Sequence, residues 1–314
     1  MKVDIFNIAD ERLTNFLTED GFTNEFPLLK KIYYNIARPL MPSFVRAFLQ
    51  NRISEKIEPK TDFIWDEVVN IINERDLKIK YPGGSKAAAV LTHDVDTLAG
   101  FNRIPKIIEL EEKYGFKSSW NIVPYKYPVD TGIIDLIKKS GHEVGVHGYN
   151  HDGKLFYSKK IFENRFPHIN KAIKQFGAKG FRSPMVHRNL NMLQKLDIEY
   201  EASCFDYDPF QPFPGGTGSI WPFRAGKFIE LPYTLPQDHD MFYMMKQDDI
   251  GIWKRKSDWI IKNKGVILLI THPDYLSGKI LNHYKEFLIF LKQYKELWTA
   301  LPIDLTKFWK KTYD

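Results

Sequence analysis

Apolar and polar positions follow each other along the chain in a rhythm that changes at about residue 87. From there on, short and almost unbroken apolar runs, such as 87–91, are typical of strands buried on both faces. They alternate with stretches in which apolar residues recur every three or four positions, some of which end at a glycine such as Gly115. We expect strands within residues 87–92, 117–123, 142–147, 179–184, 198–204 and 266–272. We expect helices within 103–115, 131–141, 158–177, 189–196, 248–265 and 277–297, with Pro167 interrupting the one over 158–177.

This order of elements predicts the fold class. Strands that alternate with helices indicate a parallel sheet, either closed into a barrel or doubly wound. No glycine-rich nucleotide-binding fingerprint follows any of the expected strands, which argues against a dinucleotide-binding fold. We therefore predict an α/β fold with a barrel-like sheet over residues 83–314. In such folds the chemistry lies at the carboxyl ends of the strands.

Residues 1–82 have a different pattern and are predicted to form a mostly helical extension or cap. The stretch 26–56 mixes apolar, aromatic and basic residues, and Pro39 and Pro42 are expected to split it. Packing on the barrel is the first expectation for this stretch, and peripheral contact with a membrane surface or an acidic partner is the alternative. A clearer helical pattern covers 62–76, and a turn is expected at 80–86.

Composition narrows the protein class only a little. The 314 residues are 43% hydrophobic and 27% charged, which is ordinary for a globular protein, and the net charge is 45 − 39 = +6. Lysines dispersed over the surface account for this excess, so we expect no nucleic-acid partner. Cys204 is the single cysteine, which excludes an internal disulfide and a cysteine-rich zinc site. Acidic residues near the start argue against a signal peptide and no apolar run approaches ~20 residues, so the cytoplasm is the expected compartment.

Polar residues gather where the expected strands stop. They are Asp94 and Asp96 after the first strand, His147 and His151 after the third, Arg182 after the fourth, and His272 and Asp274 after the last. If the strands are parallel, these ends lie on one rim. Residues two apart in a strand point to the same side, so Asp94 and Asp96 would repel each other unless a positive group lies beside them. His93 and Val95 would point the other way and are interpreted as structural.

A divalent metal would supply that positive charge. His147 and His151 are four positions apart, a spacing that places both rings on one side of a helical turn. Two imidazoles and one carboxylate are a common catalytic metal site. Asp94 or Asp96 could be the carboxylate ligand, which leaves the other as a base. Arg182 could keep that base ionised, and His272 could act as a general acid.

Taken in order, these stretches resemble a known family. THDVD, HGYNH, FRSP, the acidic segment at 201–208 and LLITHPDY are similar to the five ordered motifs of the polysaccharide deacetylase (NodB-homology) family. The resemblance covers about residues 87–275. It implies a distorted (β/α) barrel, a divalent metal that is commonly zinc, and hydrolysis of N-acetyl groups from sugars.

The resemblance also implies roles for single residues. Asp94 matches the general base, and His147 and His151 match the histidine ligands. Arg182 matches the arginine that orients the base, and His272 matches the general acid. The family usually has adjacent aspartates in its first motif, whereas Val95 separates them here. Members with an Asp-x-Asp form use the second aspartate as the ligand, which assigns the metal to Asp96.

The remaining assignments concern the tuning of His272 and the substrate. Glu201, Asp206 and Asp208 are all candidates to tune the acid, with Asp206 preferred. The backbone N–H of Met185 is expected to bind the oxyanion. Trp221, Tyr233 and His239 are expected to contact the substrate, because they lie in proline- and aromatic-rich loops.

The sequence thus predicts a zinc-dependent hydrolase that removes an N-acetyl group from a sugar or glycan precursor. Two alternatives stay open. The same site could hydrolyse a non-sugar amide, or the chain could be a non-catalytic glycan-binding protein. The acetylated sugar is the expected partner, and the sequence predicts no particular oligomeric state.

Overall fold

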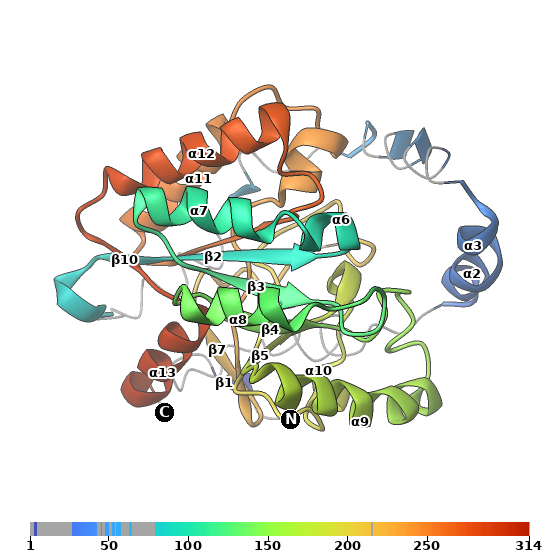
Figure 1. Ribbon diagram of the computed structural model, residues 1–314. Helices are drawn as coiled ribbons and strands as arrows, with labels where there is room; N and C mark the ends of the chain where they lie inside the picture. The colour runs from blue at the N-terminus through green and yellow to red at the C-terminus, as the bar shows by residue number, and fades with distance from the viewer. Residues whose placement is uncertain are drawn as a thin grey trace.

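The computed structural model describes residues 3–4, 27–42, 45, 48–49, 52–53, 55–57, 63–64, 79–214 and 216–313. Most of this part of the chain folds into one curled sheet with helices packed on its outer side (Figure 1). The α/β fold with a barrel-like sheet that the sequence predicts is therefore confirmed.

The central strands are parallel, and the first five of them follow one another in space as they do in sequence. They are β2 (Ala87–Val95), β3 (Ser118–Ile122), β4 (Glu143–His147), β5 (Gly180–Arg182), β6 (Tyr200–Glu201) and β9 (Val266–Thr271). β2 pairs with β9 along one edge and with β3 along the other, while β10 (Leu297–Thr299) pairs with the beginning of β2. All nine residues of β2 are buried, as its apolar run predicts.

A hairpin extends the sheet beyond β6. β8 (Phe228–Glu230) is parallel to β6, and β7 (Phe223–Ala225) and the short β1 (Val3–Asp4) follow it. Residues 231–235 then bring the chain back between β6 and β9. The Tyr233 N–H donates to Cys204 O (3.0 Å), and the Thr234 N–H donates to Leu268 O (3.0 Å). Backbone hydrogen bonds therefore run around the curled sheet from β6 to β9.

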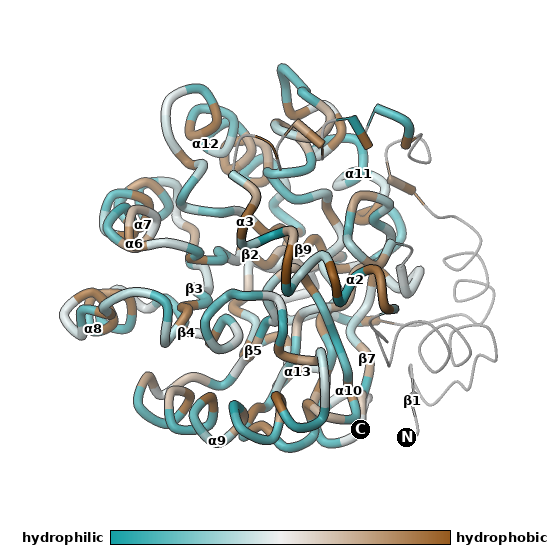
Figure 2. The backbone as a smooth tube through the Cα atoms, turned by 90° about the vertical axis from the view of Figure 1, so that its right-hand side faces the viewer, coloured by the Kyte–Doolittle hydropathy of each residue, from teal (hydrophilic) through white to brown (hydrophobic). Residues whose placement is uncertain are grey.

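Helices surround the sheet, as the view onto the carboxyl ends of the strands shows (Figure 2). They are α6 (Leu98–Phe101), α7 (Ile104–Tyr114), α8 (Thr131–Lys139), α9 (Lys159–Phe176), α10 (Leu190–Leu193), α11 (Gly251–Lys262), α12 (Gly278–Lys292) and α13 (Pro302–Tyr313). The predicted stop of α7 at Gly115 is confirmed, and this glycine has the left-handed φ of 82°. The expected break at Pro167 is wrong. α9 continues through Pro167, which lies on the exposed side, where the carbonyl freed by the missing N–H can meet water.

The N-terminal stretch that the structure describes is helical from residue 28 to residue 40. α2 (Leu28–Ile32), a π-helical turn (Tyr33–Ala37) and α3 (Arg38–Leu40) follow one another without a gap. Pro39 does not split the stretch, which ends at Leu40, before Met41 and Pro42, because a residue that precedes proline disfavours the helical conformation. The expected turn at 80–86 is present as a 3₁₀ turn (Pro82–Gly84). The helix expected at 62–76 lies, apart from Phe63 and Ile64, outside the described residues.

This stretch lies beyond the carboxyl ends of the strands, beside the mouth of the barrel (Figures 1 and 2). The Tyr34 hydroxyl lies 3.2 Å from His187 Nε2, and Arg38 Nη1 donates to Asp152 O (2.8 Å). Among the described helices, none combines the length and the apolar character that crossing a membrane requires.

Candidate metal and hydrolase site

The carboxyl ends of the parallel strands bring the predicted polar residues to one rim. Asp94 lies near the end of β2, His147 and Arg182 are the last residues of β4 and β5, and His272 directly follows β9. A cavity of about 570 Å³ lies at this rim. Asp94, His147 and His272 line it, and so do Asp96 and His151, whereas Arg182 does not. The pattern of strand ends therefore predicted the position of the site.

Three side chains at the floor of this cavity could hold a metal ion. One ligand atom each from Asp96, His147 and His151 lies within 4.8 Å of the others. Asp96 Oδ1 is 3.0 Å from His151 Nε2 and 3.4 Å from His147 Nε2. Burial alone would raise the pKa of Asp96, but the two imidazoles hold this pKa well below its usual value.

The protonation of His147 shows that this group suits a cation. His147 Nδ1 lies 3.0 Å from the backbone oxygen of Arg182, and since that oxygen can only accept, Nδ1 carries the proton. In the neutral ring, Nε2 then presents a lone pair toward Asp96 Oδ1, an atom that is itself buried. An imidazole lone pair and a carboxylate oxygen that face each other away from water fit a divalent cation between them.

The histidine pair is not on a helix, contrary to the expectation from its spacing. His147 ends β4, and the chain then turns sharply at Gly148 (φ 65°) and at His151 (φ 60°). A side chain at Gly148 would place its Cβ only 2.3 Å from Pro184 Cδ, so only glycine fits there. A loop, rather than a helical turn, therefore brings the two imidazoles together.

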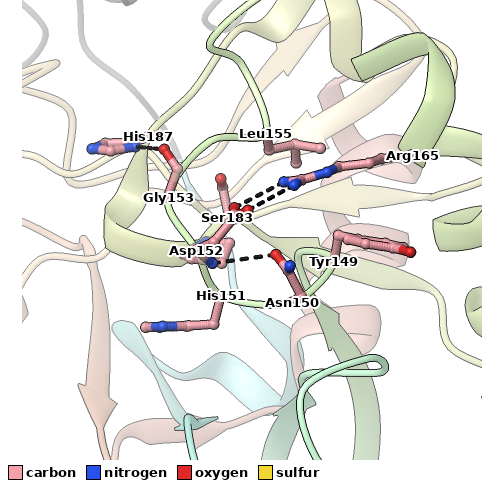
Figure 3. Close-up of a pocket in the computed structure, with 10 residues that line it drawn as sticks. Tyr149, Asn150, His151, Asp152, Gly153, Leu155, Arg165, Ser183 and His187 are labelled. Atoms are coloured by element: carbon pink, nitrogen blue, oxygen red, sulfur yellow. Dashed lines mark hydrogen bonds and ion pairs between the residues drawn. The ribbon is translucent and has the colours of Figure 1, made fainter. Parts of the chain in front are cut away.

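An ion pair outside the cavity fixes this loop. Arg165 on α9 donates from Nη1 to Asp152 Oδ1 (2.8 Å) and from Nη2 to Asp152 Oδ2 (2.6 Å). Figure 3 shows His151 pointing away from this pair, while its neighbour Asp152 points toward Arg165. The two-point contact thus holds the backbone that carries one of the candidate ligands.

Asp94 has partners different from those of Asp96. Its Oδ1 accepts from Arg182 Nη1 (2.9 Å) and from Asn121 Nδ2 (2.8 Å). Arg182 is fully buried and is oriented by Thr92 Oγ1 (2.8 Å) and by the backbone oxygen of Ala202 (2.7 Å). Burial alone would raise the pKa of Asp94, but the guanidinium holds this pKa below its usual value. The structure thus brings Arg182 to Asp94, as the sequence predicted.

The carboxylate that contacts His272 is Asp238, not Asp206. Asp238 Oδ1 lies 2.6 Å from His272 Nδ1, and Oδ2 accepts from the His272 backbone N–H (2.7 Å). Burial alone would lower the pKa of His272, but the charge and hydrogen bond of Asp238 raise this pKa to about 10. The imidazole is therefore held in its protonated form.

The three candidates from residues 201–208 have other partners. Asp206 forms a buried ion pair with Lys256 (2.7 Å), Glu201 accepts from the Ser203 N–H (2.9 Å), and Asp208 accepts from the Tyr233 hydroxyl (2.7 Å). The prediction for Asp206 is wrong because residues 231–238 run back beside β9, which places Asp238 next to His272.

Two of the four residues expected at the substrate line the cavity, and two do not. Met185 and His239 line it, and Met185 lies in a tight turn with a left-handed φ of 58°. Trp221 and Tyr233 are not among the described residues that line the cavity. Both side chains are fully buried. Trp221 Nε1 donates to Lys264 O (2.9 Å), and the Tyr233 hydroxyl donates to Asp208. Packing, rather than ligand contact, explains these two aromatic residues.

The sequence interpretation missed two residues of the site. Asn121 lies in β3, directly across from Asp94 in the register of β2 and β3. Because β3 also contains Ser118 and Ser119, its polar character did not set Asn121 apart in the sequence. Asp238 lies in a loop between β8 and α11, where no strand or helix pattern indicated which way it points.

Comparison with known proteins shows a similar sequence and several similar folds. No family model matches the sequence. The chain is similar to the peptidoglycan deacetylase of Helicobacter pylori, with 23% identity over 213 residues, which is 56% of this chain and 72% of that protein.

Solved structures share the fold at low sequence identity. A presumed polysaccharide deacetylase from Mycobacterium smegmatis superposes with a TM-score of 0.61 and 14% identity, covering 74% of this chain and 93% of that one. A probable polysaccharide deacetylase from Pseudomonas aeruginosa PAO1 gives 0.58 and 12%, covering 74% and 94%. Puue allantoinase also gives 0.58 and 12%, covering 74% and 93%.

The solved structures show that the chain has the fold of polysaccharide deacetylases, and its similarity to a peptidoglycan deacetylase agrees with the resemblance of its motifs. Its curled sheet is the distorted barrel of that fold, as the sequence predicted.

Proposed function

We propose that this protein is a metal-dependent hydrolase that removes an N-acetyl group from a sugar or glycan precursor. One observation carries the proposal. The Asp96–His147–His151 cluster, the ionised Asp94 and the protonated His272 all line the same cavity. The similarity to a peptidoglycan deacetylase supports an acetylated glycan as the substrate.

Asp94 is the proposed general base. Its carboxylate lines the cavity, and its Oδ2 lies 3.8 Å from His147 Nε2, so it adjoins the candidate metal ligands. Arg182 and Asn121 both bond to Oδ1. This arrangement holds the carboxylate charged and in one orientation, so that Oδ2 can accept a proton from the attacking water.

His272 is the proposed general acid. Asp238 bonds to Nδ1 and fixes the ring, so Nε2 carries the proton that is delivered to the departing amine. The acid and the base thus have opposite charges, each set by a buried partner on the side away from the cavity.

Asp96, His147 and His151 would hold the cation, and zinc suits two imidazoles and one carboxylate. When bound, it would supply Lewis-acid activation of the amide carbonyl and of water. The turn at Met185 is proposed to direct its backbone N–H to the developing oxyanion, since this residue lines the cavity.

Acetate release tests the proposal. Metal-loaded protein is incubated with acetylated glucosamine oligomers, with peptidoglycan and with small non-sugar amides, and Asp94→Asn serves as the inactive variant. We expect acetate from the sugars and a loss of at least about 10²-fold in the variant. Turnover of the small amides alone would favour the non-sugar alternative. No turnover by metal-loaded protein on any of these amides would contradict the proposal.

A further inference from the structure

The helical stretch at residues 28–40 has its polarity reversed relative to an ordinary surface helix. Its outward side consists of large apolar residues that are mostly exposed, namely Leu28 (72%), Leu29 (80%), Ile32 (45%), Ile36 (58%) and Leu40 (80%). A helix on the surface of a globular protein normally turns such a face toward the core. Contiguous exposed apolar residues of this kind mark an interaction surface.

The inward side of the same stretch is basic and aromatic. Lys30 lies over the ring of Phe213 (3.3 Å), and Lys31 lies over the ring of Tyr157 (5.5 Å). Arg38 bonds to the backbone of Asp152. All three basic residues are only partly exposed, so they lie between the apolar side and the barrel. These contacts fix the stretch so that its apolar side faces away from the barrel.

A second apolar surface borders the same cavity. A groove of about 520 Å³ is lined by Leu49, Ile53 and Ile57 together with charged neighbours. Ile53 and Ile57 also line the catalytic cavity, as does Arg38. A ligand in the cavity therefore lies next to both the groove and the α2–α3 stretch.

We infer that the outward side of residues 28–40 docks on the surface of an anionic lipid bilayer and turns the cavity toward the headgroup layer. Interfacial helices bury an apolar side about 5–10 Å deep and carry basic residues opposite. Because a helix is about 10–12 Å across, Lys30, Lys31 and Arg38 would then lie at the level of the lipid phosphates. The net charge of +6 has the matching sign.

The docking itself goes beyond the proposed hydrolase activity, whereas its consequence for the substrate rests on that proposed function. It adds that the accessible substrates are those whose sugar lies at a membrane surface, because the docked cavity opens toward that layer. A second copy of this chain could also cover an apolar face, but a flanking row of basic residues would repel its own copy.

Vesicle sedimentation tests the inference without any catalytic readout. The full chain is mixed with vesicles of phosphatidylcholine alone or with phosphatidylglycerol added. We expect binding to the anionic vesicles that weakens as salt is raised. Leu29→Glu combined with Leu40→Glu should weaken binding at least about tenfold, because two apolar contacts are replaced by charges that anionic lipid repels.

The matched control is Ile289→Glu, which places a charge at an exposed apolar residue (41%) on α12. It should bind as the unchanged protein does, and so should Asp94→Asn, which separates docking from activity. Hydrogen exchange gives a second readout, since anionic vesicles should slow exchange in residues 28–40. The inference is overturned if neither vesicle type binds, if the double variant binds unchanged, or if light scattering shows a dimer that the double variant abolishes.

Discussion

At the scale of single residues, the two aspartates at the end of β2 avoid mutual repulsion by having separate partners. The charge of Asp94 is compensated by Arg182, whereas Asp96 faces His147 and His151. Two carboxylates at this spacing would otherwise raise each other's pKa. The structure thus allows Asp94 to act on a proton while Asp96 holds a cation.

The contact between Asp238 and His272 gives a prediction about pH dependence. In Asp238→Asn, the pKa of His272 should fall, because the charge that raises it is removed. An acid must be protonated to act, so the alkaline limb of kcat/KM should move to lower pH, by at least about one unit. A profile of kcat/KM against pH measures this shift.

Asp206→Asn is the control for that measurement. Asp206 bonds to Lys256 rather than to His272, so the alkaline limb should stay in place even if the variant is less stable. A limb that moves in Asp206→Asn and stays in Asp238→Asn would contradict the assignment.

The proposed catalytic residues were predictable where they depend on strand ends, and not where they depend on loops. Asp94, His147, Arg182 and His272 each lie at or next to the end of a buried strand, and parallel pairing fixes where such ends lie. Asp238 depends on the path of residues 231–238, which backbone hydrogen bonds to Cys204 and Leu268 decide. Contacts so distant in sequence leave no local pattern.

At the scale of elements, the loop after β4 brings the two predicted histidine ligands together, although the sequence predicted a helical turn there. The spacing of His147 and His151 suggested a helical turn, but Gly148 and His151 both have positive φ. Loop and helix can bring the same two rings together. The helix expected to break at Pro167 instead continues and presents Arg165 to this loop. Tertiary contacts here override the tendency of proline to interrupt a helix.

The ion pair between α9 and this loop gives the second prediction. Arg165→Met should lower metal affinity about 10–100-fold, a typical cost of losing support behind a metal ligand, while the fold is retained. Isothermal titration with zinc measures the affinity.

A matched control lies near the same helix. Lys195→Met removes an ion pair with Glu163 of α9 that is largely exposed to solvent and not in contact with the ligand loop. Exposed pairs of this kind contribute little, so zinc affinity should not change. Equal affinities of the Arg165→Met variant and the unchanged protein would show that the loop holds its shape without α9.

At the scale of the whole molecule, the N-terminal stretch and the barrel are joined through a buried histidine. His187 Nδ1 lies 3.2 Å from Gly153 O, so this nitrogen carries the proton, and Nε2 lies 3.2 Å from the Tyr34 hydroxyl. Burial lowers the pKa of His187 to about 3. The ring is therefore neutral in the folded protein at any ordinary pH.

This neutral ring gives the third prediction, on stability. The unfolded chain takes up a proton at His187 below a pKa of about 6.5, and the folded protein does not until about 3. The contribution of His187 to the free energy of unfolding is fully present above pH 6.5. It should fall by about 1.4 kcal/mol per pH unit as the pH is lowered from about 6.5 to about 3. Glu143, with a pKa raised to about 7 by burial, acts in the opposite sense, so the overall slope is mixed.

The informative quantity is thus the difference between two proteins. Urea unfolding of the unchanged protein and of His187→Gln at several pH values between 7.5 and 4.5 isolates the contribution of this ring. The unchanged protein should lose more free energy of unfolding on acidification than the variant. Parallel curves would mean that His187 is protonated in the folded state.

The most direct test of the account is a metal titration followed by acetate release. Metal-stripped protein is given increasing amounts of zinc, and the rate of acetate release from an N-acetylglucosamine oligomer is measured at each step. The Asp96–His147–His151 site predicts a rate that rises in proportion to zinc and breaks at one equivalent, with no such rise in Asp96→Ala. Full activity in the metal-stripped protein, or an unchanged titration in Asp96→Ala, would contradict the account.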